Sequence, residues 1–130
     1  MEAFYIGTPE VMSTYIIYLC LKTFKSKGGV EFFEDESKRK SKLIYNEIDG
    51  DFYKNDIHEA CRSRTVITFW IKDDEILEKK FIEEAKAENL IGLNPFAVYP
   101  GIRACAYNSM PIKGVEKLVL FMWKFKQENN

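Results

Sequence analysis

The residue with the clearest chemical potential is Arg103, which stands in the segment PGIRACAYN. Apart from the arginine, this segment is mainly small and apolar and predicts a strand. A guanidinium group presents a planar fork of donors that fits a carboxylate or a phosphate. Arginines rarely lie in an apolar setting unless they are paired or reach a cleft. The residues alone leave two interpretations open: anion recognition and an ordinary salt bridge.

A helix start at Thr8, Pro9 and Glu10 is the next feature that chemistry could use. Threonine caps free amides, proline loses no needed hydrogen bond at the first helical position, and glutamate complements the helix dipole. The pattern predicts a helix over residues 9–25, ended by the glycine pair 28–29. Its apolar residues cover more than one face, so we expect a buried helix that also meets another domain or subunit.

Other candidates for chemistry are weak. His58 is the only histidine, and no nucleophile has a spacing tied to it, so we expect no catalytic role for it. Cys20, Cys61 and Cys105 are too widely spaced for a zinc finger, and we predict no metal site. Cys20 and Cys105 lie in apolar runs and are expected to be small core residues.

Length and composition limit the class of protein. The chain has 130 residues, 46% of them hydrophobic, and a net charge of -1. These values predict one packed domain. The order of the predicted elements divides it into a helical lead-in over residues 1–50 and a mixed part over residues 51–130. The charge argues against a nucleic-acid or anionic-membrane surface. No targeting segment is recognised, and the longest apolar run, residues 15–21, is far below the ~20 residues of a membrane span. We expect a soluble, cytoplasmic protein.

A second helix is predicted over residues 30–48. Its inner side is marked by large apolar residues: Phe32, Phe33, Leu43, Ile44 and Ile48. The charged run EDESKRKSK in its middle predicts a solvated face. Asp49-Gly50-Asp51 should end this helix.

The rest of the chain predicts a small sheet with helices. Residues 65–71 are β-branched and aromatic, with Ile67, Phe69 and Ile71 on one face of the strand. A helix over residues 74–88 should follow, closed by Asn89 in the left-handed conformation. Two short strands, at 90–93 and 102–108, and a last helix from about residue 111 complete the order. We predict an α/β fold of two layers, a short, mostly antiparallel sheet covered by helices.

Four segments resemble phosphoserine aminotransferases. The segment GIRACAYNSMPIKGVEKLVLFMWKF is similar to the end of these enzymes, where G-G-I-R-A-S-x-Y-N-A-M-P precedes the final helix. KSKLIYNEIDGDFYKN with RSRTVITF resembles the family's K-x-L-Y-x-x-I-D and R-S-x-M-N-V-x-F segments. EKKFIEEAKAENLIGL resembles the helix and strand between them, and GTPEVMSTYIIYLCLK resembles the N-T-P-P-T-F helix start. The similarity is collinear over essentially the whole chain.

The resemblance implies the C-terminal small domain of a fold-type I enzyme that depends on pyridoxal 5'-phosphate. These homodimers move an amino group between glutamate and 3-phosphohydroxypyruvate in serine biosynthesis. The Schiff-base lysine and the aspartate that pairs with the pyridine nitrogen belong to the large domain, which precedes the segment found here. We therefore expect the chain to contain no catalytic residue, not to bind the cofactor covalently, and to work with a large aminotransferase domain or to self-associate.

The resemblance also assigns roles to individual residues. Arg103 matches the arginine that binds the substrate α-carboxylate. Thr8, next to Gly7, matches the threonine that reaches the partner's cofactor phosphate across the dimer. A hydroxyl group and free amides at a helix N-terminus suit a phosphate physically.

Several positions depart from the family pattern. Gly7 replaces an asparagine and Glu10 a proline, which brings a carboxylate near the expected cofactor phosphate. Phe96 and Ala97 stand where the family has the His-Arg pair that recognises the substrate phosphate, and Pro100 replaces the first glycine of G-G-I-R. Phenylalanine and alanine cannot neutralise a phosphate dianion. Either other residues supply the phosphate contacts, phosphoserine is not the substrate, or the chain is a non-catalytic paralogue that acts as a dimerisation or protein-binding module.

Overall fold

A computed structural model describes residues 10–72, 74–95 and 101–130 of the chain. The chain divides into two compact units, Met1–Glu34 and Asp35–Asn130. The described elements are, in order, α1 (Val11–Ser26), α2 (Gly29–Ile48), β1 (Tyr53–Lys54), the 3-10 helix η1 (Glu59–Cys61), β2 (Val66–Ile71), α3 (Glu75–Ala87), β3 (Ile102–Cys105) and α4 (Ile112–Asn129).

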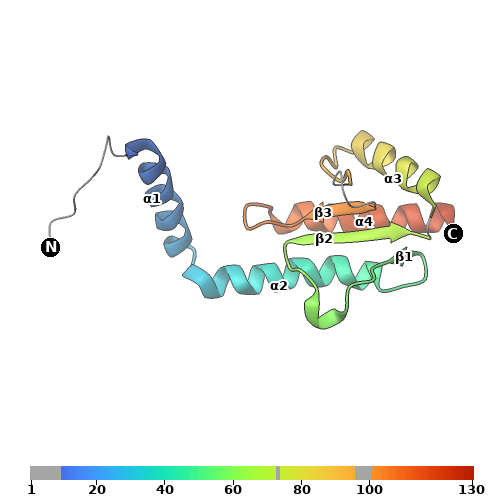
Figure 1. Ribbon diagram of the computed structural model, residues 1–130, viewed down its shortest axis with the longest axis horizontal. Coiled ribbons are helices and arrows are strands. Elements are labelled where there is room, and N and C mark those ends of the chain that lie inside the picture. The colour runs from blue at the N-terminus through green and yellow to red at the C-terminus, as the bar shows by residue number, and fades with distance from the viewer. Residues whose placement is uncertain (1–9, 73, 96–100) are drawn as a thin grey trace. The chain divides into compact units, whose positions relative to one another are not determined.

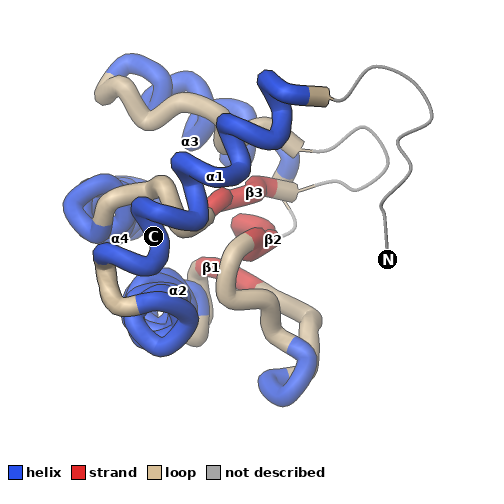
Figure 2. The backbone as a smooth tube through the Cα atoms, turned by 90° about the vertical axis from the view of Figure 1, so that its left-hand side faces the viewer, coloured by secondary structure: helices blue, strands red, loops and turns tan. Residues whose placement is uncertain are grey.

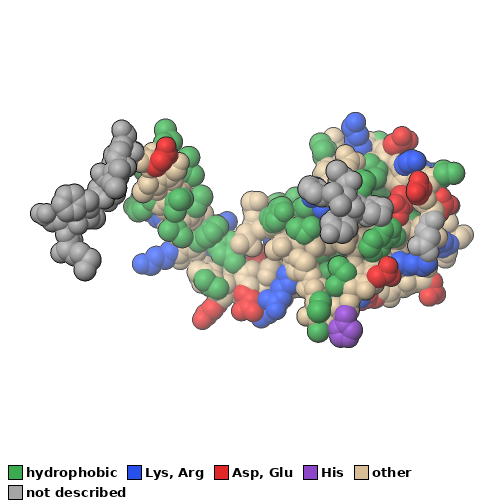
Figure 3. Space-filling view, viewed as in Figure 1, with side chains coloured by type: hydrophobic (Ala, Val, Ile, Leu, Met, Phe, Trp, Pro, Cys, Tyr) green, Lys and Arg blue, Asp and Glu red, His purple; other side chains and the backbone are tan. Residues whose placement is uncertain are grey.

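The first unit consists of α1 and the start of α2. The predicted end of α1 is confirmed, since Gly28 and Gly29 follow it with φ values of 110° and 68°. The predicted burial of α1 is wrong for this chain: none of its residues is buried, and Cys20 is exposed. Apolar side chains therefore cover the surface of α1 (Figure 3). The only packed aromatic contact described between α1 and α2 joins Phe24 and Phe33, with ring centroids 4.6 Å apart.

The second unit contains a three-stranded sheet in the order β1-β2-β3 (Figure 1). Both strand pairs are antiparallel, with Lys54 opposite Trp70 and Thr68 opposite Arg103. The predicted antiparallel α/β fold is confirmed. Along β2 the side chains alternate between buried and half-buried, which places Ile67, Phe69 and Ile71 in the core as expected.

One face of this sheet carries the core. Helices α2, α3 and α4 lie on the same side of the three strands in the end-on view (Figure 2). Phe81 of α3 is fully buried and contacts Phe69 of β2 and Phe121 and Phe125 of α4, with ring centroids 6.0, 4.9 and 5.0 Å away. Edge-on contacts of this kind add to the burial energy of each ring. The aromatic cluster fixes the position of the sheet against the helices.

The charged run of α2 differs from the prediction. It does not form a wholly solvated face, because Lys40 is 1% exposed and Ser37 and Ser41 are buried with it. The Lys40 ammonium group reaches the far end of the chain and donates hydrogen bonds to the carbonyls of Tyr107 and Met110, at 2.7 and 3.2 Å. These partners lie 67 and 70 residues away, so local charge patterning could not have revealed them.

The strands differ from the prediction in three places, one of which is the end of β3 at Cys105, three residues before the predicted end. Residues 90–93 form no strand, although Leu93 lies beside β3 and its carbonyl accepts a hydrogen bond of 3.1 Å from the Arg103 amide. The short strand β1 was not predicted, because two residues are too few to show a period. Tyr53 of β1 donates its hydroxyl to the Met122 carbonyl at 2.8 Å. Asn89 has the predicted left-handed conformation, with φ of 61°.

Within the described residues, no helix is both long enough and apolar enough to cross a membrane.

Candidate functional site

The candidate site is the face of the sheet that points away from the core. Because Ile102 and Ala104 are buried, the alternation of β3 turns the half-buried Arg103 and Cys105 to the opposite face. On β2 the same alternation places Val66, Thr68 and Trp70 on that face. Among the described residues of the second unit, no α-helix covers it (Figure 2).

Arg103 sits directly opposite Thr68 in the β2–β3 register. The Thr68 carbonyl accepts a hydrogen bond of 2.6 Å from the Asn55 side chain, which ties the segment after β1 to the middle of the sheet. Side chains opposite one another in antiparallel strands lie within contact distance. Arg103 therefore lies on an edge strand of the described sheet, paired with the central strand β2, and its guanidinium can serve a ligand that approaches this face.

Trp70 and Gly101 shape one end of the same face. Gly101 is buried and has φ of 94°, a conformation that side-chain-bearing residues rarely adopt. A Cβ atom at this position would lie 2.8 Å from the Trp70 indole nitrogen and 2.9 Å from the Phe69 carbonyl. Only glycine allows the indole to lie this close to the backbone two residues before Arg103. Trp70 thus lies on the same face of the sheet as Arg103, close to the backbone of Gly101.

The turn that follows β3 is fixed from the helical side by Lys40. Both of its carbonyl acceptors, on Tyr107 and Met110, belong to the turn between β3 and α4. Burial lowers the pKa of the Lys40 ammonium group, and the nearby Glu36 carboxylate opposes this change. Lys40 is a positional support for the Arg103 strand, since it anchors the segment by which that strand leaves the sheet.

A second support holds the segment between β1 and β2. The Arg62 guanidinium donates two hydrogen bonds of 2.6 Å to the Asp49 carboxylate, a bidentate pair. It also lies over the Tyr45 ring, 4.7 Å from the centroid, and the Tyr45 hydroxyl donates to the Ser63 carbonyl at 3.0 Å. The hydrogen bond with Asp49 raises the pKa of Arg62. These contacts fasten the segment to the end of α2.

Four of the residues assigned by resemblance lie outside the described residues. These are Gly7 and Thr8, assigned to the cofactor phosphate, and Phe96 and Ala97, at the positions for the substrate phosphate. Glu10 is described at the start of α1, where its carboxylate accepts a hydrogen bond of 2.7 Å from the Ser13 hydroxyl. The structure thus describes the position of Arg103, the proposed carboxylate-binding residue, whereas the four phosphate positions lie outside the described residues.

The remaining chemical candidates have local structural roles. His58 caps η1, with its Nδ1 atom accepting a hydrogen bond of 3.3 Å from the Ala60 amide. Cys61 is exposed, and Cys105 is half-buried on the sheet face that points away from the core, so the predicted core position of Cys105 is wrong. In the part of the chain that the structure describes, no three His, Cys, Asp or Glu side chains gather as metal ligands would.

Comparison with known proteins identifies what this sequence and fold resemble. The chain is 40% identical over 126 residues to the phosphoserine aminotransferase of Stenotrophomonas maltophilia (strain R551-3), and 40% identical over 125 residues to that of Bacillus subtilis (strain 168). Each match covers 95% of this chain but only 35% and 34% of the relative. No family model matches the chain.

Solved structures agree with the sequence matches. The phosphoserine aminotransferase of Bacillus circulans subsp. alkalophilus superposes with a TM-score of 0.90 at 34% identity, over 95% of this chain and 35% of that one. A phosphoserine aminotransferase from Trichomonas vaginalis, solved with PLP bound, superposes with a TM-score of 0.82 at 28% identity. That match covers 90% of this chain and 34% of that one.

The fold is therefore a small α/β domain that matches a segment of solved phosphoserine aminotransferase structures. More specifically, the chain is homologous to a segment of phosphoserine aminotransferase, and it spans about a third of the length of the curated relatives it matches. Its residue pattern had already indicated this family. The supports that sequence reasoning missed, Lys40 and the Trp70–Gly101 contact, depend on positions distant in the sequence or on backbone conformation, and neither has a local signature.

Proposed function

We propose that the chain supplies the substrate-carboxylate-binding part of a phosphoserine aminotransferase-like transaminase. The proposed reaction transfers an amino group between glutamate and 3-phosphohydroxypyruvate, a step of serine biosynthesis. The observation that carries the proposal is the position of Arg103, half-buried in β3 and turned to the sheet face that no described α-helix of its unit covers. The homology to these enzymes supports it over nearly the full chain.

Arg103 is proposed to bind the α-carboxylate that amino donor and keto acceptor share. Its guanidinium can donate two parallel hydrogen bonds, which fix the direction of the carboxylate as well as its position. Trp70 then limits the approach of water and substrate from one side. Pyridoxal phosphate, when bound by a lysine of a large domain, supplies the electron withdrawal that the reaction requires. The contribution of this chain is orientation of the substrate.

The phosphate contacts are proposed to come largely from outside this chain. Phe96 and Ala97 offer no donor side chains for a substrate phosphate, and the Glu10 carboxylate would repel an anion at the start of α1. Thr8, with the backbone of Gly7, remains the proposed contact to the cofactor phosphate of a dimer partner. A transaminase containing this segment should therefore depend less on the substrate phosphate than its relatives do.

A chimeric enzyme provides the test. We would replace the matching segment of the Bacillus subtilis phosphoserine aminotransferase with this chain and measure kcat and KM for glutamate. In an active chimera, Arg103→Lys should lower kcat/KM roughly a hundredfold, because it keeps the charge but loses the bidentate fork. The matched control is Arg39→Lys on an exposed face of α2. An active chimera that tolerates Arg103→Lys within twofold would contradict the carboxylate role.

The lone chain gives a second test of the proposal. Titration with pyridoxal phosphate, borohydride reduction and peptide mass mapping should yield no stoichiometric lysine adduct. A single stoichiometric adduct would mean that a lysine of this chain holds the cofactor, and the proposed division of labour would be wrong.

A binding module is the second candidate function, and α1 is the observation that favours it. Nine large apolar side chains of α1 are exposed: Val11, Met12, Tyr15, Ile16, Ile17, Tyr18, Leu19, Leu21 and Phe24. An apolar surface of this extent seldom remains in contact with water. The purified chain should therefore self-associate, and Ile16→Glu should shift it toward the monomer in sedimentation velocity. A chain that stays monomeric at all concentrations would count against this function.

A further inference from the structure

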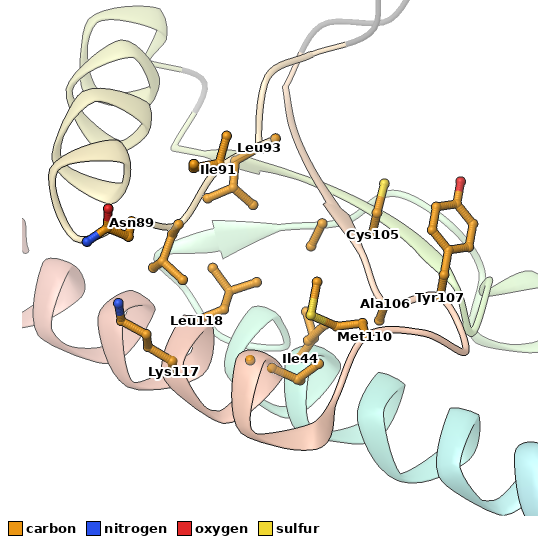
Figure 4. A pocket seen from close by; sticks show the side chains of 15 residues that line it. Ile44, Asn89, Ile91, Leu93, Cys105, Ala106, Tyr107, Met110, Lys117 and Leu118 are labelled. Carbon is orange, nitrogen blue, oxygen red and sulfur yellow. The ribbon is translucent and has the colours of Figure 1, made fainter.

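A cavity that the proposed function does not use lies between β3, α4 and the segment after α3 (Figure 4). It has a volume of about 460 Å³, within the range of small-molecule sites. Its floor is apolar and buried, with Ile44 from α2, Ala104 from β3, and Val115 and Leu118 from α4. The site lies wholly within the second unit.

Small residues create the space. Ala104 and Ala106 leave room above the helices, and Gly92, which has no side chain, lines the cavity from the segment after α3. Large apolar side chains stand at the mouth in contact with solvent: Ile91 is 81% and Met110 40% exposed. An apolar floor with an exposed apolar rim favours a ligand with a hydrocarbon body.

The charged side chain in the lining of the cavity indicates which polar group the ligand carries beside its hydrocarbon body. Of the described residues that line it, Lys117 is the only one with a charged side chain. Its ammonium group donates one hydrogen bond to the Glu88 carbonyl at the end of α3. An ammonium group has three donors, so a ligand carboxylate can be bound without breaking that bond. Lys117 lies at the same end of the cavity as Asn89, opposite Tyr107 (Figure 4).

We propose that this cavity binds a medium-chain fatty carboxylate, with the alkyl chain over Leu118 and the carboxylate on Lys117. The volume equals about fifteen waters at ~30 Å³ each, which is enough for a ten-carbon acid with space for its motion. This ligand combines the two properties that the lining requires, an apolar body and a single negative charge. The inference is independent of the proposed transaminase function.

The test is a titration of the full chain, labelled with ¹³C at alanine and methionine methyl groups, with decanoate below its micelle concentration. Ala104 and Ala106 should shift in a saturable manner, since both line the cavity. Ala60 in η1 serves as the internal control. Met12 of α1, 69% exposed, reports binding to the apolar helix instead. Shifts at Met12 without shifts at Ala104 and Ala106 would overturn the proposal.

Variants at Lys117 test the charge. Lys117→Met should weaken decanoate binding about fivefold, as expected for a partly solvated ion pair, and change decan-1-ol binding less than twofold. Lys117→Arg should keep decanoate affinity within twofold. Val115→Phe, which fills the cavity, should abolish the alanine shifts while near-ultraviolet circular dichroism confirms the fold. Equal affinity of the wild type and Lys117→Met for decanoate would refute the site, as would absence of binding in the wild type.

Discussion

Lys40 provides the most demanding test of how this fold supports its candidate site. Its side chain is 1% exposed, and its ammonium group donates to the carbonyls of Tyr107 and Met110 in the turn after β3. Lys40→Met keeps most of the length of the side chain but removes the charge and both donors. The variant therefore separates the hydrogen bonds from the packing of the aliphatic part.

The expected loss follows from two opposing effects. A carbonyl that loses its donor costs about 1–3 kcal/mol when it is buried, so about 2–6 kcal/mol is an upper range for these two acceptors, whose residues are exposed. Removing the buried ammonium group offsets part of this loss of stability, because the cost of desolvating the charge no longer opposes folding. We expect Lys40→Met to lower the free energy of unfolding by about 2–4 kcal/mol. Lys42→Met is the matched control, since Lys42 is exposed on the same helix and should change stability by less than about 0.5 kcal/mol.

The pH dependence distinguishes a buried ammonium group from a passive side chain. Burial lowers the pKa of Lys40 in the folded state below its ordinary value of 10.5. At pH values between the lowered pKa of the folded state and 10.5, Lys40 is more protonated in the unfolded chain than in the folded chain. The contribution of Lys40 to the free energy of unfolding therefore rises with pH and levels off above 10.5. In Lys40→Met this rise is absent. The stability difference between wild type and variant should therefore grow as pH approaches 10.5 from below.

Urea denaturation followed by circular dichroism, repeated from neutral to alkaline pH, measures both quantities. Comparing the two proteins at each pH cancels the titration of Tyr45 and Tyr53, whose pKa values are raised by burial and are common to both. If Lys40→Met is as stable as the wild type, or if the difference does not change with pH, Lys40 is not the buried, charged support described here.

Three further variants probe the core, the strand end and a buried carboxylate. Phe81→Ala should cost about 3–5 kcal/mol in urea denaturation, because Phe81 is fully buried among aromatic rings; a loss below 1 kcal/mol would contradict its central position. Gly101→Ala should cost more than about 1 kcal/mol and shift the emission of Trp70 in a Trp123→Phe background, since its Cβ would lie 2.8 Å from the indole nitrogen. Unchanged emission and stability would refute that contact. Burial raises the pKa of Glu47 above its ordinary 4.5, more than the Lys126 ammonium group 3.9 Å away lowers it. The carboxylate thus reduces stability at neutral pH, so Glu47→Gln should stabilise the chain slightly at pH 7 but not below 4.5. A destabilised variant at pH 7 would show that the attraction to Lys126 outweighs burial.

Regular elements were predictable where a local period existed. The alternation of apolar residues along β2 predicted its buried face, with Ile67, Phe69 and Ile71, correctly. Residues 90–93 have strand composition, but only one backbone hydrogen bond joins them to β3, so no ladder forms. Burial of Lys40 depends on a turn far along the chain. Composition predicts which residues can form a helix or a strand. It does not predict which other segment of the protein pairs with them or packs against them.

The difference between what composition predicts and which packing partner is present also accounts for the burial of α1 and of Arg103. Both show an apolar sequence pattern, and both were expected to be buried or partnered. Within this chain the α1 side chains are exposed, whereas Arg103 is half-buried because Ile102 and Ala104, its neighbours in β3, are core residues. The Arg103 backbone is thus fixed by the packing of the second unit alone, and any variant that keeps this core also keeps the guanidinium on the outer face of the sheet. The surface of α1 has no such internal constraint. We therefore infer that the candidate carboxylate site would persist in the isolated chain.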